Sequence, residues 1–258
     1  VRILITLLGV VAISVLIGLA SGRPFESPDS SAARATAQSS PGPAVSATPR
    51  PSPAPTLAPS PTSAPVSPTP DDGWLIQSRE TFDEVSTWPA KAEAGWASGY
   101  TDGRYWLRLS GQQTISYRVP IDGKEFRITV DVQVKNGYAG LVFLASEAGE
   151  LYRFQVDGAG KYRLGKRQGS TFTPLIDWTA SPALKPGTDA VNQIEIRRVQ
   201  DELQLYANNT LLTTTPVPSD TTLSAQVGMT LDALARDQVA EAFFDNLVVR
   251  LPFAPSGQ

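Results

Sequence analysis

The sequence contains neither cysteine nor histidine, and these two absences exclude several kinds of chemistry. Without cysteine the chain has no thiol nucleophile, no disulfide bond and no cysteine that could carry a lipid. Without histidine it has no Ser-His-Asp relay, and the usual nitrogen and sulfur ligands of zinc are missing. Any chemistry therefore depends on carboxylate, hydroxyl, lysine, arginine or tyrosine side chains.

The chain also lacks a strong excess of one charge. Its formal net charge is −3, and lysines and arginines are scattered among aspartates and glutamates. Proteins that bind nucleic acid usually carry their positive charge in a clustered patch. The sequence therefore predicts no nucleic-acid partner, and it leaves the oligomeric state open.

Aromatic residues are nearly absent from the first 73 residues. All five tryptophans follow that position, and Phe25 is the only aromatic residue before it. The remaining chain, about 185 residues, is long enough to bury roughly 70% of its unfolded surface in one core. We therefore expect one folded domain at residues 74–252, followed by a C-terminal tail at residues 253–258.

The N-terminus carries an apolar run from Ile3 to Ala20, preceded by Arg2. As a helix with a rise of 1.5 Å per residue the run is about 27 Å long, close to the thickness of a hydrocarbon core. Gly18-Leu19-Ala20 also offers a small-x-small cleavage site. Residues 1–21 are therefore predicted to be a signal anchor helix in the cell membrane or a cleaved signal peptide. Arg2 favours an extracytoplasmic C-terminal domain, which is secreted if the segment is cleaved.

Residues 22–73 are dominated by proline, serine, alanine and threonine, as in Pro49-Arg50-Pro51-Ser52-Pro53. This composition cannot bury enough apolar surface to offset the entropy lost on ordering. We therefore predict a disordered linker rich in polyproline II conformation.

Apolar and polar residues alternate from Phe126 to Lys135, the pattern of a strand with one buried face. The run ends at the turn signal Asn136-Gly137. Ala139 to Ala145 is continuously apolar and predicts a fully buried strand, and Val227–Leu231 and Ala242–Val249 predict the strands that close the domain.

Two β-hairpins are also predicted. Leu151–Val156 and Lys161–Lys166 flank a glycine-rich turn, and Gln193–Val199 and Glu202–Ala207 flank Gln200-Asp201. The residues expected to point inward are Tyr152, Phe154, Val156, Tyr162, Leu164, Ile194, Ile196, Leu203 and Leu205. No segment predicts a convincing helix, and the best candidate, Leu231–Glu241, is equally typical of a loop. Many short strands separated by turns predict an antiparallel β-sandwich.

Short motifs recur in a recognisable order over most of Leu75 to Leu251. They include Thr81-Phe82-Asp83, Gly140-Leu141-Val142-Phe143, Tyr152-Arg153-Phe154-Gln155-Val156, Asn192-Gln193-Ile194-Glu195-Ile196 and Phe244-Asp245-Asn246-Leu247. In this order they resemble the concanavalin A-like, laminin-G-like jelly-roll superfamily, and within it the bacterial 3-keto-disaccharide hydrolase-like branch. The resemblance implies an all-β jelly-roll fold. It does not specify a function, because lectins, glycan-binding modules, adhesion domains and glycosidases share that fold.

A jelly-roll glycosidase needs two carboxylates that face one cleft. The laminarinase-type motif Glu-x-Asp-x-x-Glu, which places both on one strand, is absent from the sequence. The nearest pairs, Glu147 with Glu150 and Asp83 with Glu84, fall in predicted turns or at the wrong spacing, and Asp131 stands alone on its strand. We therefore assign no catalytic residue and expect no enzymatic activity.

The outward faces of the central strands are predicted to form a polar platform. Arginine, glutamine, aspartate and tyrosine supply the planar hydrogen-bonding groups that bind sugars, although an ordinary solvated sheet face has the same composition. The ten residues of the platform are Arg127, Asp131, Gln133, Arg153, Gln155, Arg163, Glu195, Arg197, Gln204 and Tyr206.

Within this set, the hairpin places Arg153 and Arg163 side by side on one outward face. Two adjacent guanidiniums repel unless an anion joins them, and Asp131, Glu195 or an acidic polysaccharide could serve. This pair slightly favours an acidic ligand. Because both are expected to be surface positions, replacing both with glutamine should change the free energy of unfolding by no more than about 1 kcal/mol.

Two further features have open interpretations. Trp106 and Trp178 could stack on a sugar, but their aliphatic neighbours favour burial. Asp83 and Asp245 could meet where the terminal strands pair, and carboxylate oxygens suit calcium, so they are weak candidates for a structural calcium site in a chain with no other predicted cofactor.

Taken together, the sequence predicts an extracytoplasmic, membrane-tethered binding module for carbohydrate or another cell-envelope polymer. The alternatives are a protein-interaction or adhesion domain and, third, a glycosidase.

Overall fold

The computed structural model describes the backbone of residues 12–16 and all of residues 73–111, 114–121, 123–145, 150–169, 171–217, 224–233, 235 and 237–253. The chain divides into two units, Val1–Leu19 with Pro70–Gln258, and Ala20–Thr69. The second unit, and with it nearly all of the predicted linker, lies outside the described residues. All further description concerns the first unit.

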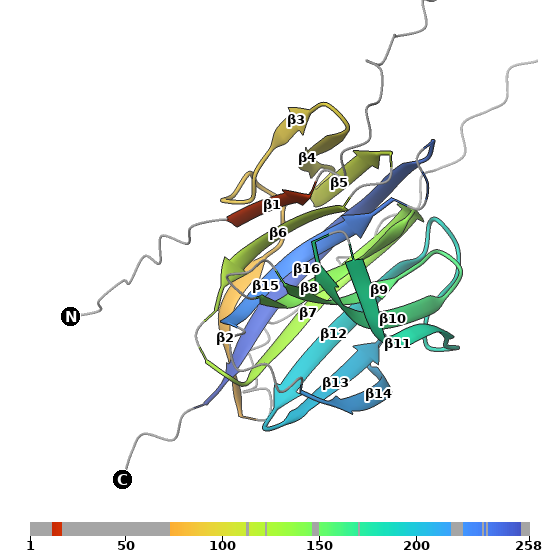
Figure 1. Cartoon of the computed structure of the whole chain (residues 1–258). Helices are drawn as coiled ribbons and strands as arrows, with labels where there is room; N and C mark the ends of the chain where they lie inside the picture. The colour runs from red at the N-terminus through yellow and green to blue at the C-terminus, as the bar shows by residue number, and fades with distance from the viewer. Residues whose placement is uncertain are drawn as a thin grey trace, which may run out of the picture. The chain divides into compact units, whose positions relative to one another are not determined.

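The described strands form two antiparallel sheets (Figure 1). The seven-stranded sheet has the order β1 (Ala12–Leu16), β6 (Thr114–Pro120), β15 (Ser224–Asp232), β8 (Tyr138–Ala145), β9 (Leu151–Val156), β10 (Lys161–Gln168) and β11 (Thr171–Ala180). The nine-stranded sheet has the order β14 (Thr210–Pro216), β13 (Glu202–Ala207), β12 (Val191–Val199), β7 (Phe126–Asn136), β16 (Val239–Pro252), β5 (Arg104–Ser110), β4 (Trp96–Thr101) and β3 (Lys91–Glu93), while β2 (Trp74–Glu80) also pairs with β16.

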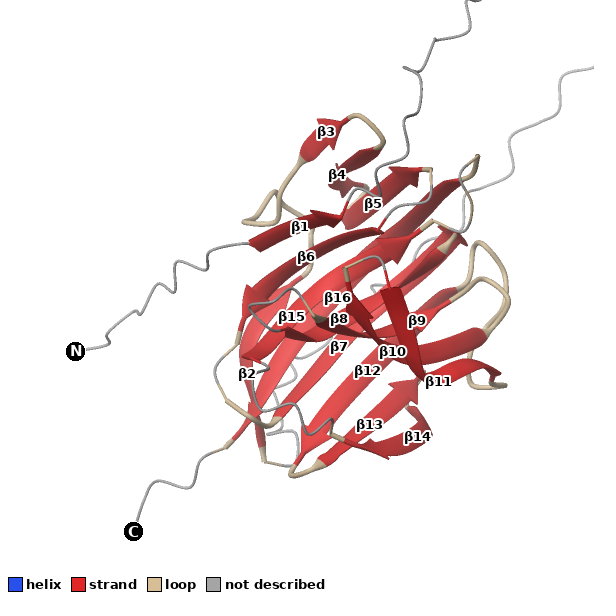
Figure 2. Cartoon of the chain, in the orientation of Figure 1, coloured by secondary structure: helices blue, strands red, loops and turns tan. Residues whose placement is uncertain are grey.

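One hydrophobic core lies between the two sheets. It contains inward residues of both, among them Phe154 and Leu164 of the seven-stranded sheet and Ile128, Ile194 and Leu205 of the nine-stranded sheet. The alternation that predicted these strands thus places the expected side chains inward, and the antiparallel β-sandwich is confirmed. Strand and loop make up the described residues, which contain no helix (Figure 2).

The predicted N-terminal helix finds no counterpart in the described residues. The described part of the apolar run, Ala12–Leu16, is strand β1, which pairs with the edge strand β6. For these five residues the expectation of a helix is therefore wrong, because an edge strand offers unpaired backbone groups that an apolar, β-branched segment can join. The rest of the run lies outside the described residues. Over the part of the chain that is described, no helix is long and apolar enough to cross a membrane.

Turn residues connect the strands as their chemistry requires. Gln200 adopts a φ of 53° between β12 and β13, and Asn208 and Asn209 adopt 48° and 64° between β13 and β14. In the β9–β10 hairpin, the Asp157 carboxylate accepts hydrogen bonds from the backbone amides of Ala159 (2.9 Å) and Lys161 (2.8 Å). This turn sets the register in which Tyr162 faces Val156.

Candidate functional site

The structure divides the ten platform residues between two sheets. Seven lie on the nine-stranded sheet, on β7, β12 and β13: Arg127, Asp131, Gln133, Glu195, Arg197, Gln204 and Tyr206. The other three lie on the seven-stranded sheet, on β9 and β10: Arg153, Gln155 and Arg163. The expectation of a single platform is therefore wrong. A sandwich has two outward faces, and alternation along a strand does not say to which sheet the strand belongs.

Glu195 organises the outward face of the nine-stranded sheet. Its carboxylate accepts hydrogen bonds from Arg127 Nε (2.8 Å) and Thr129 Oγ1 (3.0 Å), and it also pairs with Arg197 Nε. The guanidinium of Arg197 lies over the ring of Tyr206, 4.3 Å from its centroid. Glu195 is buried beneath these groups, so the guanidiniums are held in fixed positions at the surface.

A second group of polar side chains lies beside the first. The carboxylate of Asp131 accepts hydrogen bonds from the amides of Gln193 (3.2 Å) and Asn246 (3.0 Å). Arg104 donates to the side-chain oxygen of Gln133 at 2.8 Å. These contacts orient the planar amide and carboxylate groups, which are the groups that form paired hydrogen bonds with sugar hydroxyls.

A hollow of about 240 Å³ opens on this face. Sequence reasoning identified Arg127 and Glu195 in its lining and missed the other six residues, which are Arg79, Thr129, Gln193, Asn246, Val248 and Arg250. Thr129 and Gln193 share the outward face with Arg127 and Glu195 at a spacing of two, so alternation could have found them. Asn246 could not be found in this way, because it lies at an irregularity of β16 with a φ of 51°.

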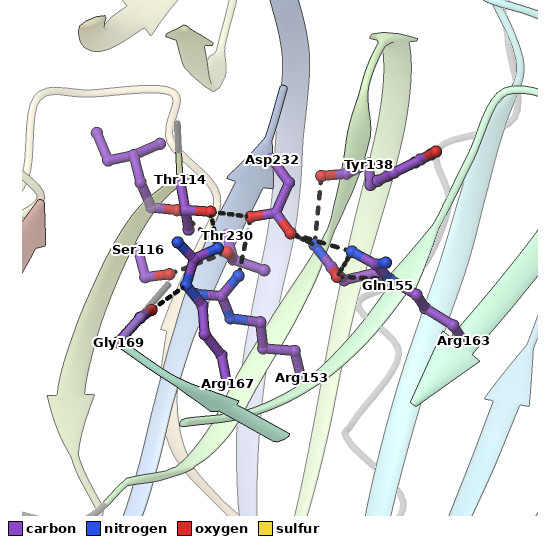
Figure 3. A network of polar contacts seen from close by, with 11 residues as sticks. Thr114, Ser116, Tyr138, Arg153, Gln155, Arg163, Arg167, Gly169, Thr230 and Asp232 are labelled. Carbon is purple, nitrogen blue, oxygen red and sulfur yellow. Dashed lines mark hydrogen bonds and ion pairs between the residues drawn. The ribbon is translucent and has the colours of Figure 1, made fainter. Parts of the chain in front are cut away.

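On the seven-stranded sheet, Asp232 at the end of β15 is the centre of a polar network (Figure 3). One carboxylate oxygen accepts hydrogen bonds from Thr114 (2.6 Å) and Arg153 (2.8 Å). The other accepts from Gln155 and Arg163, both at 3.1 Å. The sequence therefore predicted the arginine pair correctly but named the wrong partner, because Asp131 and Glu195 belong to the other sheet.

Burial distinguishes this network from a solvated surface. The side chain of Arg153 is 1% exposed, and Gln155 and Asp232 are also buried. Although burial alone would raise the pKa of Asp232, the charges of Arg153, Arg167 and Arg163 and the hydroxyl of Thr114 hold it below its ordinary value. The expectation that Arg153 is a surface position of small energetic importance is therefore wrong.

Three aromatic rings surround the guanidinium of Arg163. It lies 4.8 Å from the ring centroid of Tyr138, 4.0 Å from that of Phe172 and 4.7 Å from that of Trp178. Trp178 is half-buried, and its ring lies 4.5 Å from that of Tyr138. Trp106 is also half-buried. The predicted burial of both tryptophans is therefore only partial, because each lies on an outward face of its sheet.

The candidate carboxylates are placed as follows. Asp83 and Glu84 are exposed, Glu150 pairs with Lys166 at 2.8 Å, and Glu147 lies outside the described residues. Asp131 faces Asp245 on the neighbouring strand β16. Burial raises the pKa of Asp245, and the charges of Asp131 and Asp83 add to this effect.

These carboxylates give little support to a calcium site. Asp83 and Asp245 are close enough to influence one another, as the sequence suggested. However, the described residues contain no group of three or more acidic side chains placed to hold a metal ion. Two carboxylates alone fall short of the six to eight oxygen ligands that calcium takes. The absence of a bound cofactor stays a prediction, with Asp83 and Asp245 as weak candidates for calcium.

Comparison with known proteins identifies the fold. No family model and no curated protein matches the sequence. Among solved structures, a protein of unknown function with a galectin-like fold from Bacillus subtilis has a TM-score of 0.50 at 13% identity, over 69% of this chain and 97% of that one. An endo-β-galactosidase from Clostridium perfringens that releases GlcNAcα1-4Gal has a TM-score of 0.50 at 10% identity, over 73% and 65% of the two chains. The chain therefore has a jelly-roll fold of the concanavalin A-like type.

Proposed function

We propose that the chain is a non-catalytic carbohydrate-binding module that holds its ligand on the outward face of the nine-stranded sheet. The observation that carries this proposal is the hollow of about 240 Å³, which is lined by planar hydrogen-bonding side chains. Buried Glu195 holds Arg127 of the lining in place, together with Arg197, which faces Arg127 on the neighbouring strand, so their donors are oriented before any ligand binds. Preorganisation of this kind lowers the entropic cost of binding.

The chemistry of the hollow suits a sugar ring. A guanidinium donates hydrogen bonds in pairs, and a side-chain amide both donates and accepts, which matches adjacent hydroxyls on a pyranose. Val248 adds an apolar side chain to the lining. The endo-β-galactosidase has a similar fold and acts on a glycan. For this chain, the proposal of a carbohydrate ligand rests on the side chains of the hollow alone, because a shared fold does not establish a shared function. Membership of the 3-keto-disaccharide hydrolase-like branch is likewise part of the proposal.

We further propose that residues 1–21 attach the chain to the cell membrane and that residues 22–73 are an extended linker, with the domain outside the cell. Membrane insertion competes with the pairing of β1 with β6, because Ala12–Leu16 takes part in both. Protease added to intact cells is expected to cut first between Ala44 and Pro70 and to release the domain. Full protection of the domain would contradict the proposed orientation.

A glycan array probed with the full chain tests the proposed ligand. We expect retention on a restricted set of glycans and no release of sugar from them. Retention on no glycan, together with capture of one protein partner, would favour the alternative of an adhesion domain.

A second candidate function is glycoside hydrolysis, and one observation favours it. Asp131 and Asp245 face each other across neighbouring strands and both line a smaller hollow of about 70 Å³. The pKa of Asp245 is raised, mainly by burial, as a general acid requires. If the parent protein releases sugar and both Asp131→Asn and Asp245→Asn abolish that release, the function of this face is catalysis and not binding alone.

A further inference from the structure

The polar network of the seven-stranded sheet has more positive than negative charge. Figure 3 shows Arg153 and Arg167 approaching Asp232 from one side and Arg163 with Gln155 approaching from the other. All three arginines act electrostatically on the same carboxylate. The exposed carboxylate of Asp177 also acts on Arg163, but it is solvated. The network therefore places three guanidiniums around one buried carboxylate.

Asp232 has no capacity left to neutralise this excess. A carboxylate offers about four acceptor positions, and Thr114, Arg153, Gln155 and Arg163 occupy four. The Nε atom of Arg153 is buried without a hydrogen-bond partner. An unbalanced positive charge in a buried network is costly unless another anion joins it. The network therefore has two more positive groups than negative ones.

The electrostatics of the arginines agree with this count. Burial lowers the pKa of Arg153 to about 10, and the neighbouring charges of Arg167 and Arg163 act in the same direction against the opposing effect of Asp232. Burial also lowers the pKa of Arg163. An additional anion beside these groups would stabilise their charged forms.

The outer layer of the network is open to a ligand. The side chain of Arg163 is 13% exposed, and Arg167, Tyr138, Phe172 and Trp178 are also partly exposed. A guanidinium among partly exposed aromatic rings supplies two kinds of contact at once. The guanidinium can pair with a carboxylate, and an aromatic ring can pack on the face of the sugar that carries it.

We propose that this face of the seven-stranded sheet is a second binding site, which takes the carboxylate of a uronic acid in an acidic polysaccharide. Arg163 and Arg167 donate hydrogen bonds to the ligand carboxylate, and Trp178 packs on the sugar ring. The site lies on a different sheet from the hollow of the proposed function, so neither site requires the other.

Affinity electrophoresis of the full chain tests this site, with gels that contain polygalacturonate or the neutral polymer dextran. The variants are Arg163→Gln and Arg167→Gln, and the control is Arg108→Gln, which removes an equal charge from an exposed position on β5. We expect retention on polygalacturonate but not on dextran. Each test variant should weaken retention by at least about tenfold, because each loses a charge-assisted contact, while the control should behave as the parent.

A measurement on the parent protein keeps the proposal testable if Arg163→Gln fails to fold. Polygalacturonate at saturating concentration should raise the melting temperature, while dextran should not, and Trp178→Phe should change the tryptophan emission response to the polymer. Equal loss of retention in Arg108→Gln would reduce the effect to general charge attraction and overturn the site. So would an unchanged melting temperature of the parent. If sodium sulfate at the same ionic strength raises the melting temperature equally, the site binds a small inorganic anion and the proposed polysaccharide ligand is wrong.

The two sites can be distinguished by their variants. If Arg79→Gln abolishes binding of a glycan and Arg167→Gln does not, the glycan binds to the nine-stranded sheet. If Arg167→Gln abolishes binding and Arg79→Gln does not, the glycan binds to the second site. The failure of one proposal can therefore be recognised without reference to the other.

Discussion

Replacing Asp232 by asparagine removes the charge that four side chains of the seven-stranded sheet bind. The substitution keeps the size of the side chain, but it removes the charge and replaces one acceptor oxygen by an NH2 donor among four donors. Arg153 then remains 1% exposed with no carboxylate beside it. Removing one partner of a buried ion pair typically costs about 3–5 kcal/mol. For a domain of this size that loss lowers the melting temperature by on the order of 10 °C.

Chemical denaturation followed by tryptophan fluorescence measures this loss directly. The matched control is Asp189→Asn, because Asp189 also pairs with a cation, Lys135, but its side chain is 89% exposed. We expect no measurable change in the free energy of unfolding for the control, since an exposed pair is screened by solvent. The double variant Arg153→Met with Asp232→Asn should lose less stability than the sum of the two single variants, because the two residues interact directly. Additive losses, or a loss for Asp232→Asn no larger than for the control, would refute the reasoning.

The same carboxylate predicts an acid limb in stability. The folded state holds the pKa of Asp232 below its ordinary value, so the unfolded chain binds the proton more readily. The contribution of Asp232 is therefore fully present above the unfolded pKa, which is about 4, and is lost as the pH falls towards the folded pKa. Asp232→Asn should show a shallower acid limb than the parent between pH 5 and 2. Parallel acid limbs would contradict this assignment.

Three further predictions concern the core, alkaline pH and calcium. Gly140→Ala should destabilise the domain by about 1–3 kcal/mol or more in denaturation, because the new Cβ would lie 2.0 Å from a backbone oxygen of β9. Burial raises the pKa of Tyr105 and raises that of Tyr117 to about 12. The free energy of unfolding should therefore fall as the pH rises above about 10, and absorbance should show these tyrosines ionising only on unfolding. Calcium should leave the melting temperature unchanged relative to a chelator, because the described residues contain no group of three or more acidic side chains placed to hold a metal ion. If calcium raises the melting temperature and the double variant Asp83→Asn with Asp245→Asn abolishes that rise, these two residues form a calcium site.

Sequence alternation predicted the strands that supply most of the core. Leu151–Val156 and Glu202–Ala207 were predicted with the bounds of β9 and β13, because each has a clear period of two and ends at a turn whose residues accept a left-handed backbone. The strands β2, β3, β4, β5, β6, β11 and β14 received no predicted bounds. In β2, β3, β11 and β14 every residue is exposed or partly exposed, so there is no buried face that an alternation of apolar and polar residues would indicate.

The candidate sites were harder to predict than the core, because they depend on which strands are neighbours. Gln155 and Gln133 have the same outward pattern along their strands, yet β9 pairs with β8 and β10 whereas β7 pairs with β12 and β16. Asp232 was placed at a helix-or-loop boundary, since its role depends on β6, β9 and β10, which lie far from it in sequence. Pairing between distant strands is a property of topology, and one sequence does not reveal it.

The central claim is that a glycan binds in the hollow of the nine-stranded sheet. It is tested most directly by binding isotherms of the best array glycan with the parent, Arg79→Gln and Gln193→Ala, and with Arg108→Gln, on the same sheet but outside the hollow, as the control. We predict that each of the two lining variants weakens binding by at least about tenfold while the control and all melting temperatures stay at parent values. Unchanged affinity in both lining variants, with the fold intact, would contradict the account.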